Sequence, residues 1–454
     1  MHVVQTSVSL AERMKRLPDA ILARGRPRTS TVVHVQDGVR YQRILGFGAT
    51  LTDSSAWLIR RQLSPSDRTA LMGQLFGPDG LNLDFIRLPM GASDFTARGK
   101  PYSYDDMPRG QSDPSLQHFS IAHDMPYIIP TLREALAIHP RLFVFANPWT
   151  APAWMKANQA TDDFGNVGTL LPAAFGPFAA YFVKFVQAYA RQGIAVDAIG
   201  PENEPVVAED PGMQFSEADE ATFVSRYLHP ALMSAGLSTQ VYGLDLSWDM
   251  LSFAQALAQD IVPGELTGIS WHCYFGTPAV MTALHVQAPQ LVQLINECSP
   301  EIRPFTTPQA LIGSLRNWAS AVALWNLALD PSSGPVEPPR HRCPRCEGVV
   351  TIDETTHIAR PGPTYYGLGQ FSRFIARGAV RIGTNTFVAD QTGLYDFYRP
   401  TPGLDDVAFL NPSGEKVLVT YNGTSRPLRF AVGWRGRVLD YRLPAQATTT
   451  FTWR

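Results

Sequence analysis

Two glutamates are candidate catalytic residues, because each follows a short apolar run and lies among polar residues. Glu204 lies in the segment IGPENEP, and Glu297 lies in the segment LINECSP. They are 93 residues apart (297 − 204), so only the fold can bring their carboxyl groups together. Two carboxyl groups facing each other across a sugar-sized gap suit glycoside cleavage, because one protonates the leaving oxygen and the other stabilises or attacks the oxocarbenium-like centre. Considered singly, each glutamate is better explained as a solvent-facing or ion-paired side chain.

Eight strand-like apolar runs recur through the middle of the chain, with helical stretches between them. The expected strands are Ile44–Gly48, Leu83–Leu88, Leu142–Ala146, Val196–Gly200, Gln240–Leu244, Gly268–His272, Leu291–Asn296 and Ala321–Trp325. The helical stretches include Pro65–Leu75, Met125–Ala137, Phe178–Arg191 and Glu220–Ala235. This alternation predicts an α/β fold, a (β/α)8 TIM barrel over residues 44–376 whose active site lies at the carboxyl ends of the strands. Glu204 and Glu297 then face one mouth from the fourth and seventh strands.

After residue 376 the pattern changes to short runs in which apolar and polar residues alternate. The runs VRIGTNTF, DDVAFLNPSGEKVLVTYNGT, RFAVGWRGRVLDYRL and TTTFTWR contain Asn-Pro-Ser-Gly, Asn-Gly and Arg-Gly turns. Such alternation is typical of antiparallel strands in a β-sandwich. The segment Ser30–Arg43 has the same character. We therefore expect a side β-sandwich domain built from both chain ends, residues 1–43 plus 377–454.

The composition excludes several classes of partner. The formal net charge is −2 and the two short basic clusters contain no aromatic residues, so no nucleic-acid partner is expected. No stretch of about 18 uncharged apolar residues occurs, so we expect no integral membrane segment. The N-terminal segment lacks the features of a signal peptide. We expect a secreted or periplasmic protein whose leader has been removed, with a cytoplasmic location as the alternative; the oligomeric state stays open.

Seven segments, in chain order, carry a resemblance to one family. They are GFGATLTDSSA (46–56), RLPMGASDF (87–95), ANPWTAPAWMK (146–156), PENEP, SWHCY (270–274), INECSP and LWNLALD (324–330). With these segments the chain resembles glycoside hydrolase family 30, which includes glucosylceramidases, β-glucosidases, β-xylosidases and β-1,6-glucanases. The resemblance runs from about Ile44 into the C-terminal segment NPSGEKVLVTYN. It implies a barrel with a side β-sandwich, and hydrolysis with retention of configuration through a covalent glycosyl-enzyme.

The resemblance also implies roles for the residues that match the family's motifs. Glu204 matches the general acid/base, and Glu297 matches the nucleophile. Asn203 matches an amide that hydrogen-bonds the sugar 2-hydroxyl, an interaction that strengthens in the transition state. Arg87 matches an arginine that braces the nucleophile, and a bidentate guanidinium would keep that carboxylate ionised.

Further matching residues surround the sugar on the non-leaving side of the scissile bond, the −1 glucose. Asp94 matches an acidic residue that grips its hydroxyl groups, and carboxylates suit this task because they are pure acceptors. Trp149 and Trp325 match aromatic residues around the same sugar. Tyr274 matches a tyrosine whose phenol donates to the nucleophile. His272, two residues earlier on the same strand, is expected on the same face.

Other residues of suggestive type have plainer explanations. Trp57 and Trp154 are interpreted as core residues. Asp53 either contacts sugar or caps the first helix of the barrel. Cys298 directly follows Glu297 and so points to the opposite face, where a small buried thiol is the favoured interpretation.

Cys343 and Cys346 form the sequence CPRC in a segment rich in proline and arginine, residues 332–348. Three states remain open, namely a local disulfide, a metal half-site completed by His341, and a reduced pair. We favour the disulfide in an oxidising compartment, and expect neither a metal nor a cofactor. Because the segment follows the eighth strand, it should shape the rim of the mouth and influence which leaving group is accepted.

Four functional hypotheses follow, and the first is an exo-acting β-glucosidase or glucosylceramidase. The second stays within the family but changes the substrate, to an endo-β-1,6-glucanase, a β-xylosidase or a β-fucosidase. The third, a catalytically silent carbohydrate-binding protein, is disfavoured by the presence of the complete set Arg87, Asn203, Glu204 and Glu297. The fourth, which we disfavour, is a metal-dependent hydrolase using Cys343, Cys346 and His341. The partner expected in every case but the last is a carbohydrate or glycolipid.

Overall fold

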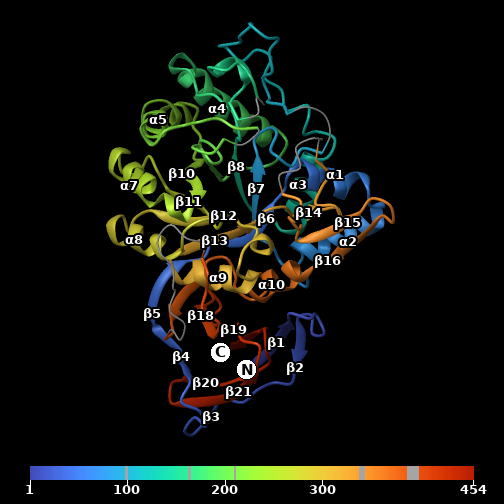
Figure 1. The fold of residues 1–454 in the computed structure, drawn as a ribbon, viewed down its shortest axis with the longest axis vertical. Coiled ribbons are helices and arrows are strands. Elements are labelled where there is room, and N and C mark those ends of the chain that lie inside the picture. The colour runs from blue at the N-terminus through green and yellow to red at the C-terminus, as the bar shows by residue number, and fades with distance from the viewer. Residues whose placement is uncertain (98–100, 162–164, 209–210, 337–342, 386–397) are drawn as a thin grey trace.

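The computed structural model describes residues 1–97, 101–161, 165–208, 211–336, 343–385 and 398–454. It has two parts, an α/β barrel in the upper part of Figure 1 and a smaller all-β part below it. This is the predicted fold class, a TIM barrel with a side β-sandwich. In the described part of the chain, none of the helices combines the length and the hydrophobicity needed to span a bilayer.

Eight parallel strands close the barrel, and each overlaps one of the expected strands. Their bounds are β6 Gly46–Thr50, β7 Phe85–Pro89, β8 Phe143–Asn147, β9 Ala198–Ile199, β10 Gln240–Ser247, β11 Gly268–His272, β12 Val292–Glu297 and β13 Ala319–Leu324. Each strand pairs with the next along the chain, and β13 returns to β6. The interior at one level is filled by large apolar side chains such as Phe85, Phe145 and Leu294, so the barrel is a packed core and not a pore.

Helices follow the strands and cover the outside of the barrel (Figure 1). Their bounds are α1 Asp53–Arg61, α2 Pro65–Phe76, α3 Ile128–Ile138, α4 Phe175–Arg191, α5 Glu217–Phe223, α6 His229–Ser234, α7 Leu251–Asp260, α8 Ala279–Gln287, α9 Thr307–Arg316 and α10 Pro363–Ser372. Thr52 caps α1 by accepting a hydrogen bond from the backbone of Ser55. The expectation that Asp53 caps this helix is therefore wrong, because the cap lies one residue earlier.

The smaller part consists of two antiparallel-rich sheets that draw strands from both sides of the barrel sequence. In one sheet the order is β2-β1-β22-β19-β18-β17-β5, and in the other it is β3-β21-β20-β4. The strands before the barrel are β1 His2–Ser7, β2 Lys15–Leu17, β3 Ala23–Arg24, β4 Val32–His34 and β5 Gln36–Arg43. Those after it are β17 Val380–Gly383, β18 Leu404–Leu410, β19 Lys416–Asn422, β20 Leu428–Trp434, β21 Arg437–Leu443 and β22 Ala447–Trp453. Apolar side chains from both sheets, including Val33, Leu418 and Phe451, form one core between them.

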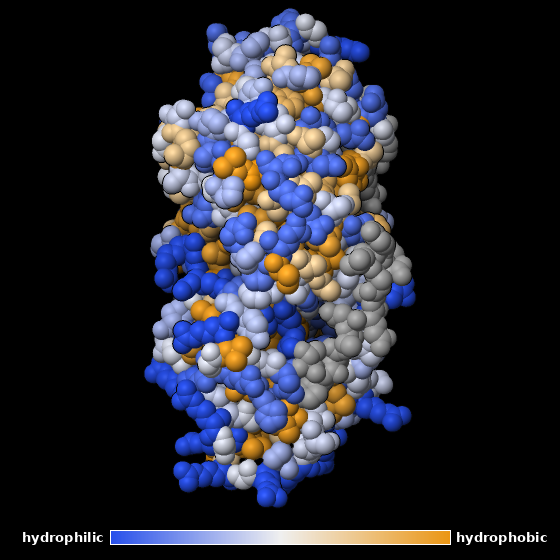
Figure 2. Space-filling view, turned by 90° about the vertical axis from the view of Figure 1, so that its left-hand side faces the viewer, coloured by the Kyte–Doolittle hydropathy of each residue, from blue (hydrophilic) through white to orange (hydrophobic). Residues whose placement is uncertain are grey.

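Helices α9 and α10 pack against both parts, α9 through barrel strand β13 and sandwich strand β18. Helix α10 packs against barrel strand β6 and also against β1 and β22 of the sandwich. A small sheet of β14 Ala328–Leu329, β15 Val350–Asp353 and β16 Ile358–Pro361 leads from the end of the barrel towards α10. On the side of the molecule shown in Figure 2, hydrophobic residues are scattered among hydrophilic ones and form no single continuous area.

Candidate active site

A cavity of about 410 Å³ opens at the carboxyl ends of the barrel strands; we call it the mouth cavity. Carboxyl groups and aromatic rings share its wall, as sugar recognition requires. Its lining includes Asp94, Trp149, Glu204, Tyr274, Phe275, Glu297, Ile302, Arg303, Trp325, Cys343 and Cys346.

Glu204 and Glu297 face each other in this cavity, from the loop after β9 and from the end of β12. A carboxylate oxygen of each and a ring nitrogen of His272 all lie within 4.8 Å of one another. Glu204 is 9% exposed and Glu297 is 5% exposed. The backbone of Glu204 is in the left-handed region, with φ of 48°, and its N–H donates to the carbonyl of Asp245 at 3.0 Å. This unusual conformation for a non-glycine residue is held in place by the neighbouring strand β10.

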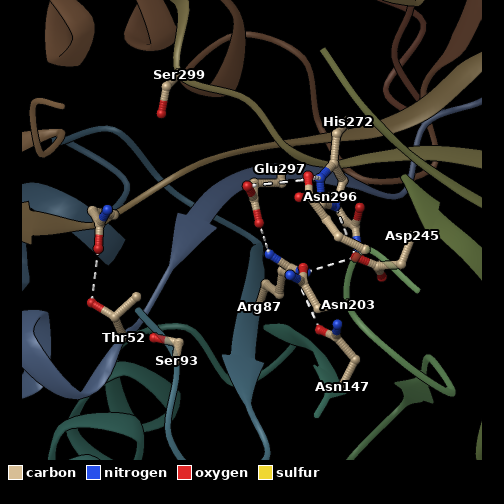
Figure 3. A network of polar contacts seen from close by, with 12 residues as sticks. Thr52, Arg87, Ser93, Asn147, Asn203, Asp245, His272, Asn296, Glu297 and Ser299 are labelled. Atoms are coloured by element: carbon tan, nitrogen blue, oxygen red, sulfur yellow. Dashed lines mark hydrogen bonds and ion pairs between the residues drawn. The ribbon is translucent and has the colours of Figure 1, made fainter. Parts of the chain in front are cut away.

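Two donors hold the carboxylate of Glu297. Arg87, fully buried on β7, donates through Nη1 to Oε2, and the Tyr274 hydroxyl donates to Oε1 at 2.7 Å. Desolvation and the Glu297 carboxylate raise the pKa of Tyr274 well above its ordinary value, so its hydroxyl stays protonated and donates. Arg87 also donates from Nε to Asn147 at 3.0 Å and from Nη2 to the side-chain oxygen of Asn203 at 2.6 Å (Figure 3). The amide nitrogen of Asn203 therefore faces away from Arg87.

Asp245 is the centre of this network, and sequence reasoning missed it. Its Oδ1 accepts from Arg87 Nη2 at 2.7 Å and from His272 Nε2 at 2.8 Å, and its Oδ2 accepts from Asn296 at 2.5 Å (Figure 3). Burial opposes ionisation, but the charges of Arg87 and His272 outweigh it and lower the pKa of Asp245. Strand β10 carries a bulge between Leu244 and Leu246 at this position, and Asp245 itself has a φ of 58°. The bulge aims the carboxylate at the network.

His272 bridges this network and Glu204. Its Nδ1 lies 2.8 Å from Glu204 Oε1, and its Nε2 lies 2.8 Å from Asp245 Oδ1. Burial alone would lower the pKa of His272, but the Glu297 charge and the hydrogen bonds to Asp245 and Glu204 raise it to about 10. A protonated ring donates from both nitrogens. His272 therefore contributes a positive charge beside both glutamates.

The charge of His272 predicts a pH-dependent contribution to stability. Because its pKa is raised from 6.5 to about 10, the stabilisation is complete below pH 6.5 and disappears as the pH rises through about 10. We expect His272→Gln to lower the free energy of unfolding most near pH 6.5. The deficit should shrink towards pH 10, as measured by denaturant unfolding across this range. A deficit that stays constant with pH would contradict a charged His272.

Two aromatic rings, Trp149 and Trp325, line the mouth cavity next to Arg87, and Phe95 packs behind them. Trp149 and Trp325 stack with ring centroids 5.3 Å apart, and Phe95 meets Trp325 edge-on at 5.7 Å. The Arg87 guanidinium lies 4.6 Å from the Trp149 ring centroid, a cation–π contact that fixes both groups. Asp94 lines the same cavity. The structure thus brings together all nine of the site residues that sequence reasoning selected: Arg87, Asp94, Trp149, Asn203, Glu204, His272, Tyr274, Glu297 and Trp325.

One pair of cysteines, Cys273 and Cys298, is disulfide-bonded where the sequence predicts a free thiol at Cys298. Cys273 and Cys298 form a disulfide with a sulfur–sulfur distance of 2.03 Å. The interpretation of Cys298 as a free buried thiol is therefore wrong. His272 and Glu297 are paired across β11 and β12, so the residues that follow them are also neighbours. The disulfide joins the segments that directly follow β11 and β12, beside Tyr274 and Glu297.

Cys343 and Cys346 also form a disulfide, and both line the mouth cavity. The Sγ of Cys346 lies 3.8 Å from the hydroxyl of Ser299, and its surroundings include Trp149 and Trp325. His341, the candidate third ligand of a metal half-site, lies outside the described residues. Since both sulfurs are bonded to each other here, neither is a thiolate that could bind a metal.

The remaining candidates lie away from the network. Trp57 is 9% exposed and belongs to the core, while Trp154 is half-buried and donates to Asp105 at 2.9 Å. The carboxylate of Asp53 is engaged by the backbone of Ala97 and by the hydroxyl of Tyr127, at 2.8 and 2.7 Å. Asp53 therefore stabilises the loop before α3, and these contacts give no support to a role in binding sugar.

Glu204, His272 and Glu297 also have the proximity expected of metal ligands. Among the described residues no other three histidines, cysteines or acids bring ligand atoms so close together. His272, however, uses one nitrogen for Glu204 and the other for Asp245, and its raised pKa keeps both protonated. A protonated imidazole has no lone pair for a metal, so the geometry fits acid–base chemistry and not metal binding.

Comparisons with known proteins agree with this architecture. The sequence matches the glycosyl hydrolase family 30 TIM-barrel domain over residues 44–375 and the family's beta sandwich domain over residues 378–451. An endo-1,6-beta-D-glucanase of Neurospora crassa is 32% identical over 420 residues, covering 89% of this chain and 86% of that protein. The lysosomal acid glucosylceramidase of Mus musculus is 28% identical over 485 residues, covering 99% and 88%. The solved structure of an endo-beta1,6-glucanase superposes with a TM-score of 0.85 at 27% identity, covering 100% of this chain and 99% of that one. The chain is a glycoside hydrolase and belongs to glycosyl hydrolase family 30.

Proposed function

We propose that this glycoside hydrolase cleaves internal β-1,6-glucosidic bonds of a glucan with retention of configuration. The observation that carries the mechanism is the approach of Glu204 and Glu297, whose nearest carboxylate oxygens lie within 4.8 Å. Retaining enzymes hold their two carboxyl groups about 5–5.5 Å apart, whereas inverting enzymes leave about 6.5–9.5 Å for a water molecule. The separation supports direct attack by one carboxylate.

The two glutamates have different roles because their partners differ. Glu297 accepts hydrogen bonds from Arg87 and Tyr274, which hold it as an aimed carboxylate for attack on the anomeric carbon. Glu204 gives its proton to the leaving glycosidic oxygen, and the covalent glycosyl-enzyme forms on Glu297. Glu204 then takes a proton from a water molecule, which attacks the same carbon and releases the sugar from Glu297.

The charges around the pair support this assignment. The pKa values of Arg87 and His272 are raised and that of Asp245 is lowered, so these three buried side chains together present a positive charge to the two glutamates. His272 donates to Glu204 Oε1, which leaves the other oxygen for the leaving group.

The remaining residues suit recognition of the −1 glucose. Asn203 has its oxygen occupied by Arg87, so its amide nitrogen is the group oriented to donate to a sugar 2-hydroxyl. Trp149 and Trp325 offer ring faces, and Asp94 offers acceptors for the other hydroxyl groups. None of these steps requires a cofactor.

The substrate assignment follows the relatives and replaces the first hypothesis of an exo-β-glucosidase or glucosylceramidase. The Neurospora crassa protein and the superposed structure are both named as enzymes that act within β-1,6-glucan. The glucosylceramidase relative is 28% identical, against 32% for the Neurospora crassa protein. Phe275 is 46% exposed at the rim of the mouth cavity, with the Arg303 guanidinium 5.4 Å from its ring centroid. An open aromatic rim suits further sugar units beyond the cleaved bond.

We expect the enzyme to shorten β-1,6-glucan to a ladder of oligosaccharides, with the β-anomer appearing first in proton NMR of the early products. Aryl β-glucoside, β-xyloside, β-fucoside and glucosylceramide should be measured beside it at matched concentrations. Release of glucose alone from the glucan would indicate exo action. Preferred cleavage of glucosylceramide would favour the glycolipid substrate, and early α-anomer would contradict retention.

A further inference from the structure

A second cavity, of about 280 Å³, lies between the barrel and the sandwich; we call it the seam cavity. From the barrel it is lined by residues after β12, including Arg303 and Thr306, and by Thr364 at the start of α10. From the sandwich it is lined by Val8 after β1, Tyr421 on β19 and Thr448 on β22. It opens to the surface, because Val8 on its rim is 54% exposed.

The seam cavity and the mouth cavity are neighbours, and the residues between them form a shared wall. Arg303 lines both cavities. Along the chain beside it, Ile302 faces the mouth cavity and Glu301 faces the seam cavity. Two consecutive residues of the CPRC loop are also distributed between the cavities, because Cys346 lines the mouth cavity and Glu347 lines the seam cavity. Arg303 therefore borders both cavities, at the point where their linings meet.

The wall itself is held in a fixed position. The backbone N–H of Glu347 donates to the carboxylate of Glu301 at 3.1 Å, which ties the CPRC loop to the segment after β12. The Arg303 guanidinium lies 5.1 Å from the ring centroid of Tyr274, whose hydroxyl donates to Glu297. Arg303 is therefore separated by one side chain, that of Tyr274, from the carboxylate that attacks the substrate. A ligand bound along Arg303 would begin next to the bond that is cleaved.

The lining of the seam cavity suits a neutral carbohydrate. The lining contains threonine and serine side chains together with the rings of Tyr421 and Phe305. This combination offers both hydrogen bonds and apolar faces. Arg303 is the one cation in its described lining, whereas Glu301 and Glu347 are acidic, so an anionic ligand would gain little. Sugar hydroxyl groups can donate to the acids and accept from the arginine.

We propose that the seam cavity is a distal subsite for the glucan chain on the leaving-group side, reached across Arg303 from the mouth cavity. This inference rests on the proposed endo action. A chain several units long would then contact both the barrel and the sandwich while one bond is cleaved. Short substrates would occupy the mouth cavity alone.

The test uses a substitution on the rim that leaves the mouth cavity untouched. Val8→Arg places a long side chain across the opening of the seam cavity, within the acidic surroundings of Glu347. We expect kcat/KM for β-1,6-linked hexasaccharide to fall roughly tenfold, equivalent to about 1.4 kcal/mol, while kcat/KM for nitrophenyl β-glucoside stays unchanged. Val262→Arg is the matched control, because Val262 is 57% exposed and lies before β11 at the opposite end of the barrel.

The outcomes separate the two proposals. If the wild-type enzyme cleaves β-1,6-glucan but Val8→Arg retains the full gain from disaccharide to hexasaccharide, the seam subsite is wrong and the proposed function stands. If the wild type does not cleave the glucan at all, both proposals fail. Binding of the hexasaccharide to a Glu297→Gln enzyme, measured by calorimetry, supplies a second readout, and equal Kd values with and without Val8→Arg would also overturn the subsite.

Discussion

Replacing Glu297 with alanine is expected to reduce kcat by about 10⁴-fold or more on every glycoside, because loss of a catalytic nucleophile in an enzyme costs on this scale. The substitution also leaves the donors on Arg87 and Tyr274 without their acceptor. Azide fits the vacated space and attacks the anomeric carbon from the same side as the lost carboxylate. With an activated aryl β-glucoside it should restore part of the rate and yield the α-glucosyl azide, which NMR identifies.

Glu204→Ala is the matched comparison, since it removes the other carboxyl group of the same pair. We expect its activity to be retained best on dinitrophenyl glycosides, whose leaving group needs no proton, and lost on the glucan. Azide should here give the β-glucosyl azide, because Glu297 still forms the glycosyl-enzyme first. Equal losses on activated and unactivated substrates would contradict the role of Glu204 as the acid.

Asp245→Asn should be the most damaging substitution that does not touch a reacting carboxyl group. It removes the negative charge between Arg87 and His272, both of which are fully buried and positive. Breaking a buried ion pair by neutralising one partner typically costs about 3–5 kcal/mol. We therefore expect a marked fall in Tm and, because Arg87 and His272 hold Glu297 and Glu204, a fall in kcat with it.

The control for this prediction is Asp260→Asn, the same change at an exposed position at the end of α7. Surface substitutions of this kind are usually within about 0.5 kcal/mol of neutral. Thermal unfolding and kcat on an aryl β-glucoside should be measured for both variants. A Tm for Asp245→Asn as high as that of Asp260→Asn would show that the network does not depend on this charge.

Much of the fold could be predicted because the barrel repeats one simple pattern. The expected strand Gly268–His272 coincides with β11, and the other barrel strands differ from expectation mainly at their ends. Their carboxyl ends must meet at one mouth, so placing Glu204 and Glu297 after the fourth and seventh strands was enough to bring them together. The distances between them depend on packing and could not be predicted.

The place of Asp245 in the site could not be predicted, because it depends on the bulge in β10. The expected strand ended at Leu244, whereas β10 continues to Ser247 and bulges where Asp245 lies. A regular strand places Leu244 and Asp245 on opposite faces, and only the bulge decides which one reaches Arg87. The sequence does contain one signal, an acidic residue within the otherwise uncharged run VYGLDLS.

The disulfide between Cys273 and Cys298 was missed for a different reason. The alternation of side chains along one strand predicts only that Cys298 points away from the site, and it says nothing about the neighbouring strand. Since both cysteines directly follow the last residue of adjacent strands, β11 and β12, they share one level of the barrel. Comparing the two strand ends side by side would have suggested the bond.

The pairing of β1 with β22 has a consequence for how the protein is made. Strand β1 leaves the ribosome before the barrel, yet it is hydrogen-bonded to β22, which is 440 residues later (447 − 7). At about 5–20 residues per second, translation of that interval takes roughly 20–90 seconds. Throughout that time one edge of β1 has only solvent or a chaperone to satisfy its backbone groups. The barrel has ample time to form first, so the sandwich should be the last part of the nascent chain to close.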